Sequence, residues 1–353
     1  MSAGAAPGGP ELVAVLPAHR FDEAALARYL RGQLPGAGER IAVRQFQGGQ
    51  SNPTFHLAAA GCEYVLRKQP PGHLLPSAHA VDREFRVIQA LAGTAVPVPR
   101  VHLLCRDPGV IGTMFYIMDY VPGRVFLDRR LPGCAPAERR AMYDDMNRVL
   151  AALHQVDWRA RGLTDFGRPQ AYVARQVARW SRQYAACRWE AFPPMERLIE
   201  WLPARVPPDA QASIVHGDYR LGNLLFHPAE PRVVAVLDWE LATLGDPLAD
   251  LAYNLLTARL PESSGGVAEA ELVALGIPGE AEYAAAYCRR TGRADAPGLE
   301  FMIVFAMFRL AAIVAGVYRR ALDGNAADAR AIERGAAFRD LAQRAWEYAQ
   351  AIG

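Results

Sequence analysis

The sequence has few cysteines, and none of them has the spacing of a metal or redox motif. The five cysteines among 353 residues are scattered, odd in number and never arranged as CxxC. This pattern disfavours a disulfide framework or a zinc site and favours a reducing, cytoplasmic location. We expect five buried free thiols, at Cys62, Cys105, Cys134, Cys187 and Cys288.

The chain also has little net charge. Its 39 Lys and Arg residues nearly balance 37 Asp and Glu residues, which leaves a formal charge of +2. No strong field is expected to recruit nucleic acid or an anionic membrane, and the oligomeric state stays open.

Long apolar runs are missing as well. The most apolar segment, 301–317, is cut by Arg309 and followed by Arg319 and Arg320, which predicts a buried core helix rather than a membrane span of about 18 residues. Residues 1–20 are rich in Gly, Ala and Pro and lack the basic and apolar regions of a signal peptide. We expect this segment to be a flexible tail.

What is present is a change of character along the chain. Short strand-like runs at 41–46, 54–59, 62–67 and 115–118 alternate with helical patterns at 21–33 and 78–91. Beyond Pro122-Gly123 the pattern is helical, apart from two short β segments around 214–237. The prediction is an α+β fold with a small β-rich lobe at 21–121 and a larger helical lobe at 122–353.

The strongest chemical signal runs from Ile214 to Phe226. A strand-like entry leads to His216, Gly217 and Asp218, and Asn223 follows five residues after the aspartate. Phosphoryl transfer to an alcohol needs a carboxylate that accepts the hydroxyl proton and hard oxygen ligands for Mg²⁺ near the phosphates. Asp218 suits the first task and Asn223 the second, while His216 would brace the loop. The alternative is a polar turn between two strands.

A second carboxylate follows at a hairpin-sized distance. Residues 233–237 form a buried-strand run that ends in Asp238, 15 residues after Asn223. A hairpin returns the chain beside its start, so we expect Asp238 and Asn223 to meet and share a metal ion. Glu240 is either a supporting group or a surface carboxylate.

HGDxxxxN followed by a strand and DWE resembles the signature of aminoglycoside phosphotransferases and their relatives. The resemblance covers about residues 40–350 and is closest to the branch whose domain is also found fused to acyl-CoA dehydrogenase domains. The segments that carry it are FQGGQSNPTFHL (46–57), YVLRKQPPG (64–72), VDREFRVIQAL (81–91), FYIMDYVPG (115–123), LHQVDW (153–158), GDPLADLAY (245–253) and FRLAAIVAGVYRRAL (308–322).

This resemblance implies a protein-kinase-like two-lobe fold that uses ATP and Mg²⁺. It makes Asp218 the catalytic base and Asn223 and Asp238 the Mg²⁺ ligands. It also implies that backbone groups at 119–121, between Asp119 and Val121, bind adenine where the lobes join. Asp250 would brace the catalytic loop, with a plain helix-face carboxylate as the alternative.

The glycine-rich turn between two predicted strands is a candidate phosphate contact. Gly48 and Gly49 would let the backbone approach phosphates, and Ser51 and Asn52 would add donors. An ordinary hairpin turn looks the same in sequence.

The strand that follows should present a cation to the phosphates. Side chains alternate across a strand, so only one of Arg67 and Lys68 can face the nucleotide. The family spacing favours Arg67. Glu84 lies at the edge of a buried helical stripe and is its expected ion-pair partner, with an ordinary flanking salt bridge as the alternative.

The sequence thus predicts an ATP- and Mg²⁺-dependent phosphotransferase that acts on a hydroxyl group of a small molecule. Kinship with the dehydrogenase-fused branch suggests a hydroxyacyl acceptor. The alternatives are an aminoglycoside-modifying phosphotransferase and a non-catalytic nucleotide-binding pseudokinase.

Overall fold

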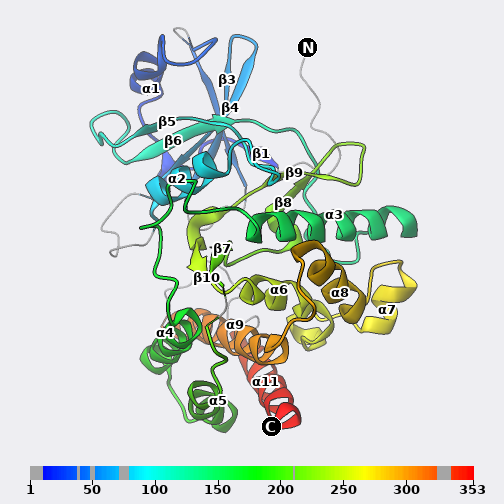
Figure 1. The fold of residues 1–353 in the computed structure, drawn as a ribbon. Helices are drawn as coiled ribbons and strands as arrows, with labels where there is room; N and C mark the ends of the chain where they lie inside the picture. Colours follow the sequence, from blue (N-terminus) through cyan, green and yellow to red (C-terminus); the bar gives the residue numbers. More distant parts are fainter. Residues whose placement is uncertain (1–10, 38–39, 48–51, 71–78, 210, 324–334) are drawn as a thin grey trace. The chain divides into compact units, whose positions relative to one another are not determined.

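The computed structural model describes residues 11–37, 40–47, 52–70, 79–209, 211–323 and 335–353. It has mixed α and β structure, with the sheet in the N-terminal part and most helices in the C-terminal part (Figure 1). Two compact units are present. Unit 1 contains residues 1–127, 158–164 and 221–242, and unit 2 contains 128–157, 165–220 and 243–353.

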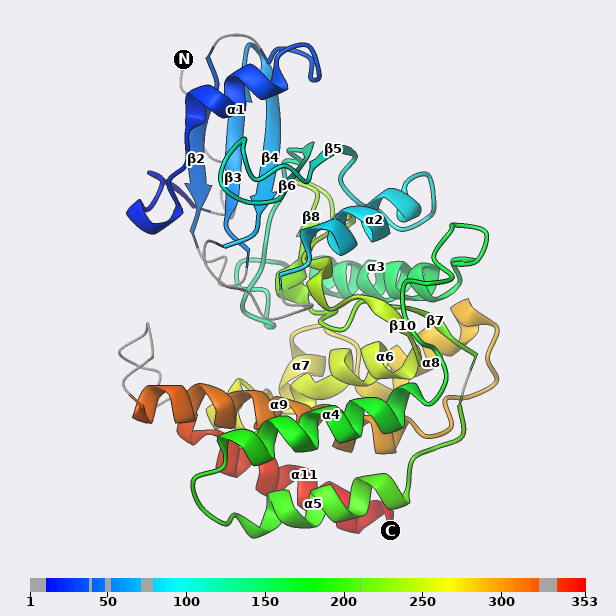
Figure 2. The same ribbon diagram turned by 90° about the vertical axis from the view of Figure 1, so that its left-hand side faces the viewer.

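Unit 1 is built on a six-stranded antiparallel sheet with the order β1-β2-β3-β4-β6-β5. The strands are β1 (Leu12–Val13), β2 (Ala42–Phe46), β3 (Thr54–Ala59), β4 (Cys62–Lys68), β5 (Val101–Cys105) and β6 (Phe115–Asp119). Ala60 and Gly61 join β3 to β4, and both have positive φ values (35° and 85°), as a tight two-residue hairpin turn requires. Strands β2, β3 and β4 lie side by side in Figure 2.

The alternation of side chains divides this sheet into two faces. On β4, Tyr64 and Leu66 pack into an apolar cluster with Leu26 and Leu30 of helix α1 (Glu23–Leu30). Helix α2 (Val81–Leu91) packs against β5 and β6, and its buried stripe includes Glu84. The face of β4 opposite the α1 cluster therefore presents Val65 and Arg67.

Two segments outside the sheet complete unit 1. One is the antiparallel hairpin of β8 (Leu224–Phe226) and β9 (Val233–Val236). Its backbone is tied to the first part of the chain, since Val236 N donates to Pro97 O at 2.9 Å. A single cut at residue 122 therefore does not separate the two units.

The predicted tail of residues 1–20 is wrong in its second half. Leu12 and Val13 pair with β2, and Leu16 N donates to the Gln45 side chain at 3.0 Å. A two-residue strand is too short to show a hydrophobic period, which explains why the sequence did not reveal it.

Unit 2 is helical around one short β ladder. Strands β7 (Ser213–Val215) and β10 (Thr243–Gly245) pair antiparallel. Its helices are α3 (Pro136–His154), α4 (Tyr172–Cys187), α5 (Pro193–Ala204), α6 (Leu248–Leu255), α7 (Glu269–Ala274), α8 (Glu280–Thr291), α9 (Leu299–Leu322) and α11 (Phe338–Ile352). Figure 2 shows α9 alongside α4, and α11 alongside α5.

Helix α9 is the core of unit 2. By length and composition alone it could cross a membrane, since its most apolar window has a mean hydropathy of 2.1. In the structure 61% of that window is buried, and α9 packs against α4, α6 and α11. The five cysteines are free as expected, but Cys62 and Cys187 are only partly buried.

Candidate functional site

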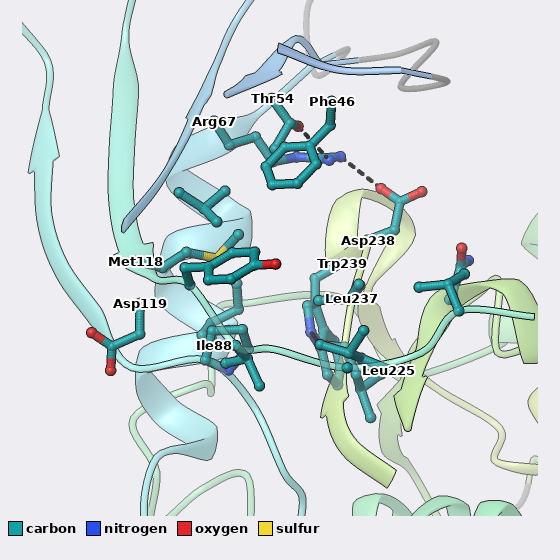
Figure 3. A pocket seen from close by; sticks show the side chains of 18 of the residues that line it. Phe46, Thr54, Arg67, Ile88, Met118, Asp119, Leu225, Leu237, Asp238 and Trp239 are labelled. Carbon is teal, nitrogen blue, oxygen red and sulfur yellow. Dashed lines mark hydrogen bonds and ion pairs between the residues drawn. The ribbon is translucent and has the colours of Figure 1, made fainter. Parts of the chain in front are cut away.

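A cavity of about 270 Å³ lies within unit 1 (Figure 3). Its walls come from the face of the sheet opposite α1, the segment after β6 and the β8–β9 hairpin. One end is apolar, with Val65, Ile88, Met118, Leu225 and Trp239 around it. A flat aromatic base fits such walls, because ligand pockets are mainly apolar with a few placed polar groups.

The segment predicted to bind adenine borders this apolar end. Asp119 and Val121 both line the cavity. The Asp119 carboxylate pairs with His102 Nε2 at 2.6 Å, so its side chain has a partner outside the apolar wall. Contact with a base through the backbone at 119–121 stays a prediction.

The other end of the cavity is polar. Arg67 Nη2 lies 2.6 Å from Asp238 Oδ1, and Arg67 Nε lies 2.7 Å from Glu84 Oε2 (Figure 3 draws the first contact). Only 13% of the Arg67 side chain is exposed. A guanidinium held between two carboxylates keeps a fixed direction, which suits a group that must meet phosphate oxygens.

Lys68 lies on the opposite face of the sheet. Its Nζ is 5.7 Å from the centroid of the Phe21 ring, and burial lowers the pKa of its ammonium. Arg67 is the member of the pair that lines the cavity. The strand alternation used in the sequence argument therefore places Arg67, and not Lys68, at the candidate site.

Glu84 is the centre of a buried polar network. Its carboxylate is 1% exposed and accepts hydrogen bonds from Asn52 Nδ2 at 2.7 Å and from Tyr116 Oη at 3.1 Å. Burial raises the pKa of Glu84 to about 7, although the charge of Arg67 acts in the opposite direction. The expected partnership of Glu84 with the strand cation is thus present.

The structure describes only part of the glycine-rich turn. Gly48, Gly49 and Ser51 lie outside the described residues. Asn52 is buried, and its amide contacts Glu84 and His79, with Oδ1 3.1 Å from His79 Nδ1. A role of Asn52 in phosphate binding remains a prediction.

The hairpin places Asn223 beside the residue that precedes Asp238, and the meeting of Asn223 and Asp238 at one metal ion stays a prediction. Leu237 N donates to Asn223 O at 2.9 Å, and both Asn223 and Asp238 line the cavity. Asp238 has a left-handed backbone (φ 66°), a conformation that costs energy for a residue with a Cβ. Its side chain is one-third exposed.

These two oxygen donors fit a magnesium ion better than a transition metal. Among the described residues there is no cluster of three or more His, Cys, Asp or Glu side chains that could hold a metal ion. Mg²⁺ needs only one or two protein oxygens because water and phosphate oxygens complete its octahedron. One carboxylate and one amide oxygen beside a fixed guanidinium meet that requirement.

The other predicted catalytic residues belong to unit 2. His216, Gly217 and Asp218 follow β7 directly. His216 is fully buried, and its Nδ1 accepts a hydrogen bond from Asp218 N at 3.2 Å. This contact supports the expectation that His216 braces the loop, since it fixes the backbone that carries Asp218.

The carboxylate of Asp250 on α6 binds the backbone of the same loop. Its Oδ2 accepts from His216 N at 2.6 Å and its Oδ1 from Gly217 N at 2.8 Å. Burial alone would raise the pKa of Asp250, but hydrogen bonds from His154 and from the Gly217 backbone outweigh burial and keep the pKa below its ordinary value. Asp250 therefore braces the loop and is not a plain helix-face carboxylate.

Three residues around Asp218 had no assigned role in the sequence argument. Arg220 Nε lies 3.1 Å from Asp218 Oδ2, and the Tyr253 hydroxyl hydrogen-bonds Asp218. Arg309 Nη2 donates to Gly217 O at 2.7 Å. The sequence could have singled out Arg309, because a single cation inside an otherwise apolar helix is expected to be buried and therefore to need a polar partner.

The chain is similar to known proteins along most of its length. The model of the family described as "Phosphotransferase enzyme family" matches residues 42–299. Acyl-CoA dehydrogenase family member 10 of Mus musculus is 46% identical over 333 residues, which cover 93% of this chain and 31% of that protein. The chain spans less than half the length of the curated relatives it matches.

Solved structures give the same fold. A crystal structure from Ralstonia eutropha JMP134, which carries the provisional name aminoglycoside phosphotransferase, is 47% identical with a TM-score of 0.86 and covers 94% of this chain and 99% of that chain. An aminoglycoside phosphotransferase APH(4)-Ia in a ternary complex with AMP-PNP and hygromycin B is 18% identical, with a TM-score of 0.60, over 92% of this chain and 98% of that chain. The second likeness concerns the fold alone.

Proposed function

The chain belongs to the phosphotransferase enzyme family, and we propose that it moves the γ-phosphoryl group of ATP, with Mg²⁺, to a hydroxyl group of a small molecule. The observation that carries the proposal is the cavity of unit 1. Its apolar end fits a base, and its polar end holds Arg67, Asn223 and Asp238. A nucleotide with its metal ion has both an apolar base and charged phosphates, and so fits both ends.

Each residue of the polar end has a defined task in this proposal. Arg67, fixed by Glu84, binds phosphate oxygens through its fork of N–H groups. Asn223 and Asp238 would hold Mg²⁺, which neutralises phosphate charge when it is bound. Arg67 must then leave Asp238 or share it, because the carboxylate is its present partner at 2.6 Å.

Asp218 acts on the acceptor. Its carboxylate orients the hydroxyl group and receives its proton as the oxygen attacks the γ-phosphorus, while the bond from that phosphorus to the β,γ-bridging oxygen breaks and ADP leaves. His216 and Asp250 fix the backbone of the loop so that the carboxylate keeps its direction. Most of the rate enhancement in phosphoryl transfer comes from such positioning and from charge neutralisation.

We further propose a hydroxyacyl compound as the acceptor and the cytoplasm as the location. The first rests on relatives named as acyl-CoA dehydrogenase family members, of which this chain matches less than half. The second rests on the absence of a disulfide pattern among the five cysteines.

The test combines nucleotide binding with transfer. Wild type should bind Mg–AMP-PNP in calorimetry and use Mg–ATP to phosphorylate a member of a panel of hydroxyacyl-CoA thioesters, hydroxy acids, sugars and aminoglycosides. Asp238→Ala should lose Mg²⁺-dependent binding, whereas Asp218→Ala should bind the nucleotide without transfer. Asp323→Ala is the control, since this aspartate pairs with Arg319 on the surface and should behave as wild type.

The other outcomes decide between the alternatives. Full transfer by either Asp218→Ala or Asp238→Ala would contradict the proposed roles. Transfer to an aminoglycoside alone would make the protein an antibiotic-modifying enzyme. Nucleotide binding without transfer to any acceptor would support a regulatory pseudokinase.

A further inference from the structure

Gly217 gives the catalytic loop (residues 216–218) a backbone that its own sterics do not fix. Its φ is positive, at 84°. Glycine lacks a Cβ and adopts positive and negative φ with similar ease, so rotation at this point meets less resistance than at another residue. Asp218 follows directly, and a rotation of the Gly217 backbone would redirect its carboxylate. The loop therefore depends on hydrogen bonds from its surroundings.

The two sides of Gly217 are held by different helices. Its N–H donates to Asp250 Oδ1 of α6 at 2.8 Å, and the other oxygen of that carboxylate accepts from His216 N at 2.6 Å. The carbonyl oxygen of Gly217 accepts from Arg309 Nη2 of α9 at 2.7 Å. Asp250 thus fixes the peptide group before Gly217, and Arg309 binds the peptide group after it.

The peptide group between Gly217 and Asp218 is a planar unit with two polar ends. One end is the carbonyl that Arg309 binds, and the other is Asp218 N–H, which donates to His216 Nδ1 at 3.2 Å. The contact with His216 is the longer of the two, and it comes from the loop itself. Arg309 instead ties this peptide group to a helix, with a charged donor that forms a stronger hydrogen bond than a neutral one.

The guanidinium of Arg309 is itself held between aromatic rings. It lies 5.3 Å from the ring centroid of Trp180 on α4 and 5.6 Å from that of Tyr253 on α6. Both helices pack against α9. Contacts of a cation with two ring faces restrict a long side chain, so little freedom remains to be lost when its N–H group meets the carbonyl. Arg309 is therefore a preorganised donor.

We propose that Arg309 is a positioning residue for phosphoryl transfer. Through the carbonyl of Gly217 it holds the peptide group that carries Asp218, and so it fixes the direction of the Asp218 carboxylate. The catalytic part of this inference rests on the proposed function, in which Asp218 receives the hydroxyl proton. Arg309 acts through the backbone and not on the reacting atoms. A misplacement of about 1 Å at a catalytic group can lower a rate about 100-fold.

Arg309→Met is the informative change, because methionine suits an apolar helix but has no N–H donor. Arg309→Lys keeps a charged donor and should lie closer to wild type. Two controls on α9 separate positioning from general damage. Arg319→Met is the same substitution at a surface residue that pairs with Asp323. Val304→Ala removes two methyl groups from a residue that is 1% exposed, which lowers stability without the loss of a hydrogen bond to the loop.

The first measurement does not depend on turnover. Hydrogen–deuterium exchange is followed by mass spectrometry in peptides that cover 214–219, where the amides of residues 216–218 are hydrogen-bonded. Exchange of these amides should be about 10-fold faster in Arg309→Met, because the loss of the carbonyl contact lets the loop open locally. It should match wild type in Arg319→Met and in Val304→Ala.

The second measurement separates binding from transfer. Arg309→Met should bind Mg–AMP-PNP with the affinity of wild type, because Arg309 belongs to unit 2 and the candidate nucleotide cavity lies in unit 1. Its kcat should fall on the order of 10- to 100-fold when Mg–ATP phosphorylates the accepted member of the panel described above. Arg309→Lys should recover part of this kcat, and the two controls should retain all of it.

Three results would overturn the inference: wild-type exchange of the loop in Arg309→Met, the same acceleration in Val304→Ala, or an unchanged kcat in Arg309→Met. Weaker binding of Mg–AMP-PNP by Arg309→Met would also overturn it, since a residue that acts on Asp218 alone does not explain such a loss. Absence of transfer by wild type would count instead against the proposed function. The exchange rates would then still decide whether Arg309 holds the loop.

Discussion

Replacing Glu84 by alanine removes a carboxylate that three side chains share. In the structure it is 1% exposed, 2.7 Å from Arg67, and it accepts hydrogen bonds from Asn52 and Tyr116. Removal of one partner of a buried ion pair costs about 3–5 kcal/mol, and each orphaned donor costs about 1–3 kcal/mol. These costs overlap because all of them concern the same carboxylate.

The expected loss in the free energy of unfolding is about 3 kcal/mol, at the lower end of this range, because Arg67 keeps Asp238 as a partner. Urea denaturation followed by circular dichroism at pH 8, without nucleotide, measures it. Glu63→Ala is the matched control, since Glu63 on β4 pairs with His56 on β3 but has a side chain that is 55% exposed. This change should cost less than about 1 kcal/mol.

A loss for Glu84→Ala that equals the loss for the control would refute the reasoning. It would mean that the network around the carboxylate does not stabilise unit 1. A large loss in the free energy of unfolding with unaltered affinity for Mg–AMP-PNP would refute the claim that Glu84 positions Arg67 for phosphate binding.

Four further predictions follow from single contacts. Arg67→Met should weaken Mg–AMP-PNP binding in calorimetry by about 10-fold or more, whereas Lys68→Met should leave that affinity unchanged, because only Arg67 lines the cavity. Asp250→Ala should lower kcat on the order of 100-fold, since two backbone N–H groups of the catalytic loop lose their acceptor; stopped-time assays of the Asp250 variant at saturating ATP measure this. Gly123→Ala should reduce the free energy of unfolding by about 1–3 kcal/mol in urea denaturation, because the added Cβ would lie 2.5 Å from a side chain and from a carbonyl oxygen of β8. The raised pKa of Glu84, about 7 against 4.5, adds a proton-linked part to its contribution to stability, which is fully present below pH 4.5 and is lost as the pH rises through 7, while its contacts with Arg67, Asn52 and Tyr116 remain; Glu84→Gln should flatten this part of a stability profile taken from pH 4.5 to 8.

Local features were readable from the sequence. The hairpin of β3 and β4 follows from two alternating runs around Ala60-Gly61, and the same alternation shows that Arg67 and Lys68 point to opposite faces. The partnership of Arg67 with Glu84 could be predicted because a buried glutamate on an amphipathic helix needs a cation. The β8–β9 hairpin was predictable from the turn signals between two apolar runs.

Contacts that depend on tertiary structure were not readable. Arg67 and Asp238 are 171 residues apart, and nothing in either segment specifies that they pair. The strand-like entry before His216 was predicted and corresponds to β7, but its partner β10 contains three residues, too few for a hydrophobic period, so their pairing was not readable. The placement of Tyr253 beside Asp218 depends on how α6 packs, so no local pattern could reveal it.

The membership of the two units has a consequence for how such enzymes diversify. Asn223 and Asp238 belong to the unit that contains the sheet, while Asp218 and the arginines near it belong to the helical unit. Under the proposed function, mutations in the helical unit would alter which alcohol is recognised while the residues proposed to bind the phosphate donor stay unchanged. Under this proposal, a protein of this kind can gain a new acceptor through substitutions in the helical unit alone, without loss of binding to the phosphate donor.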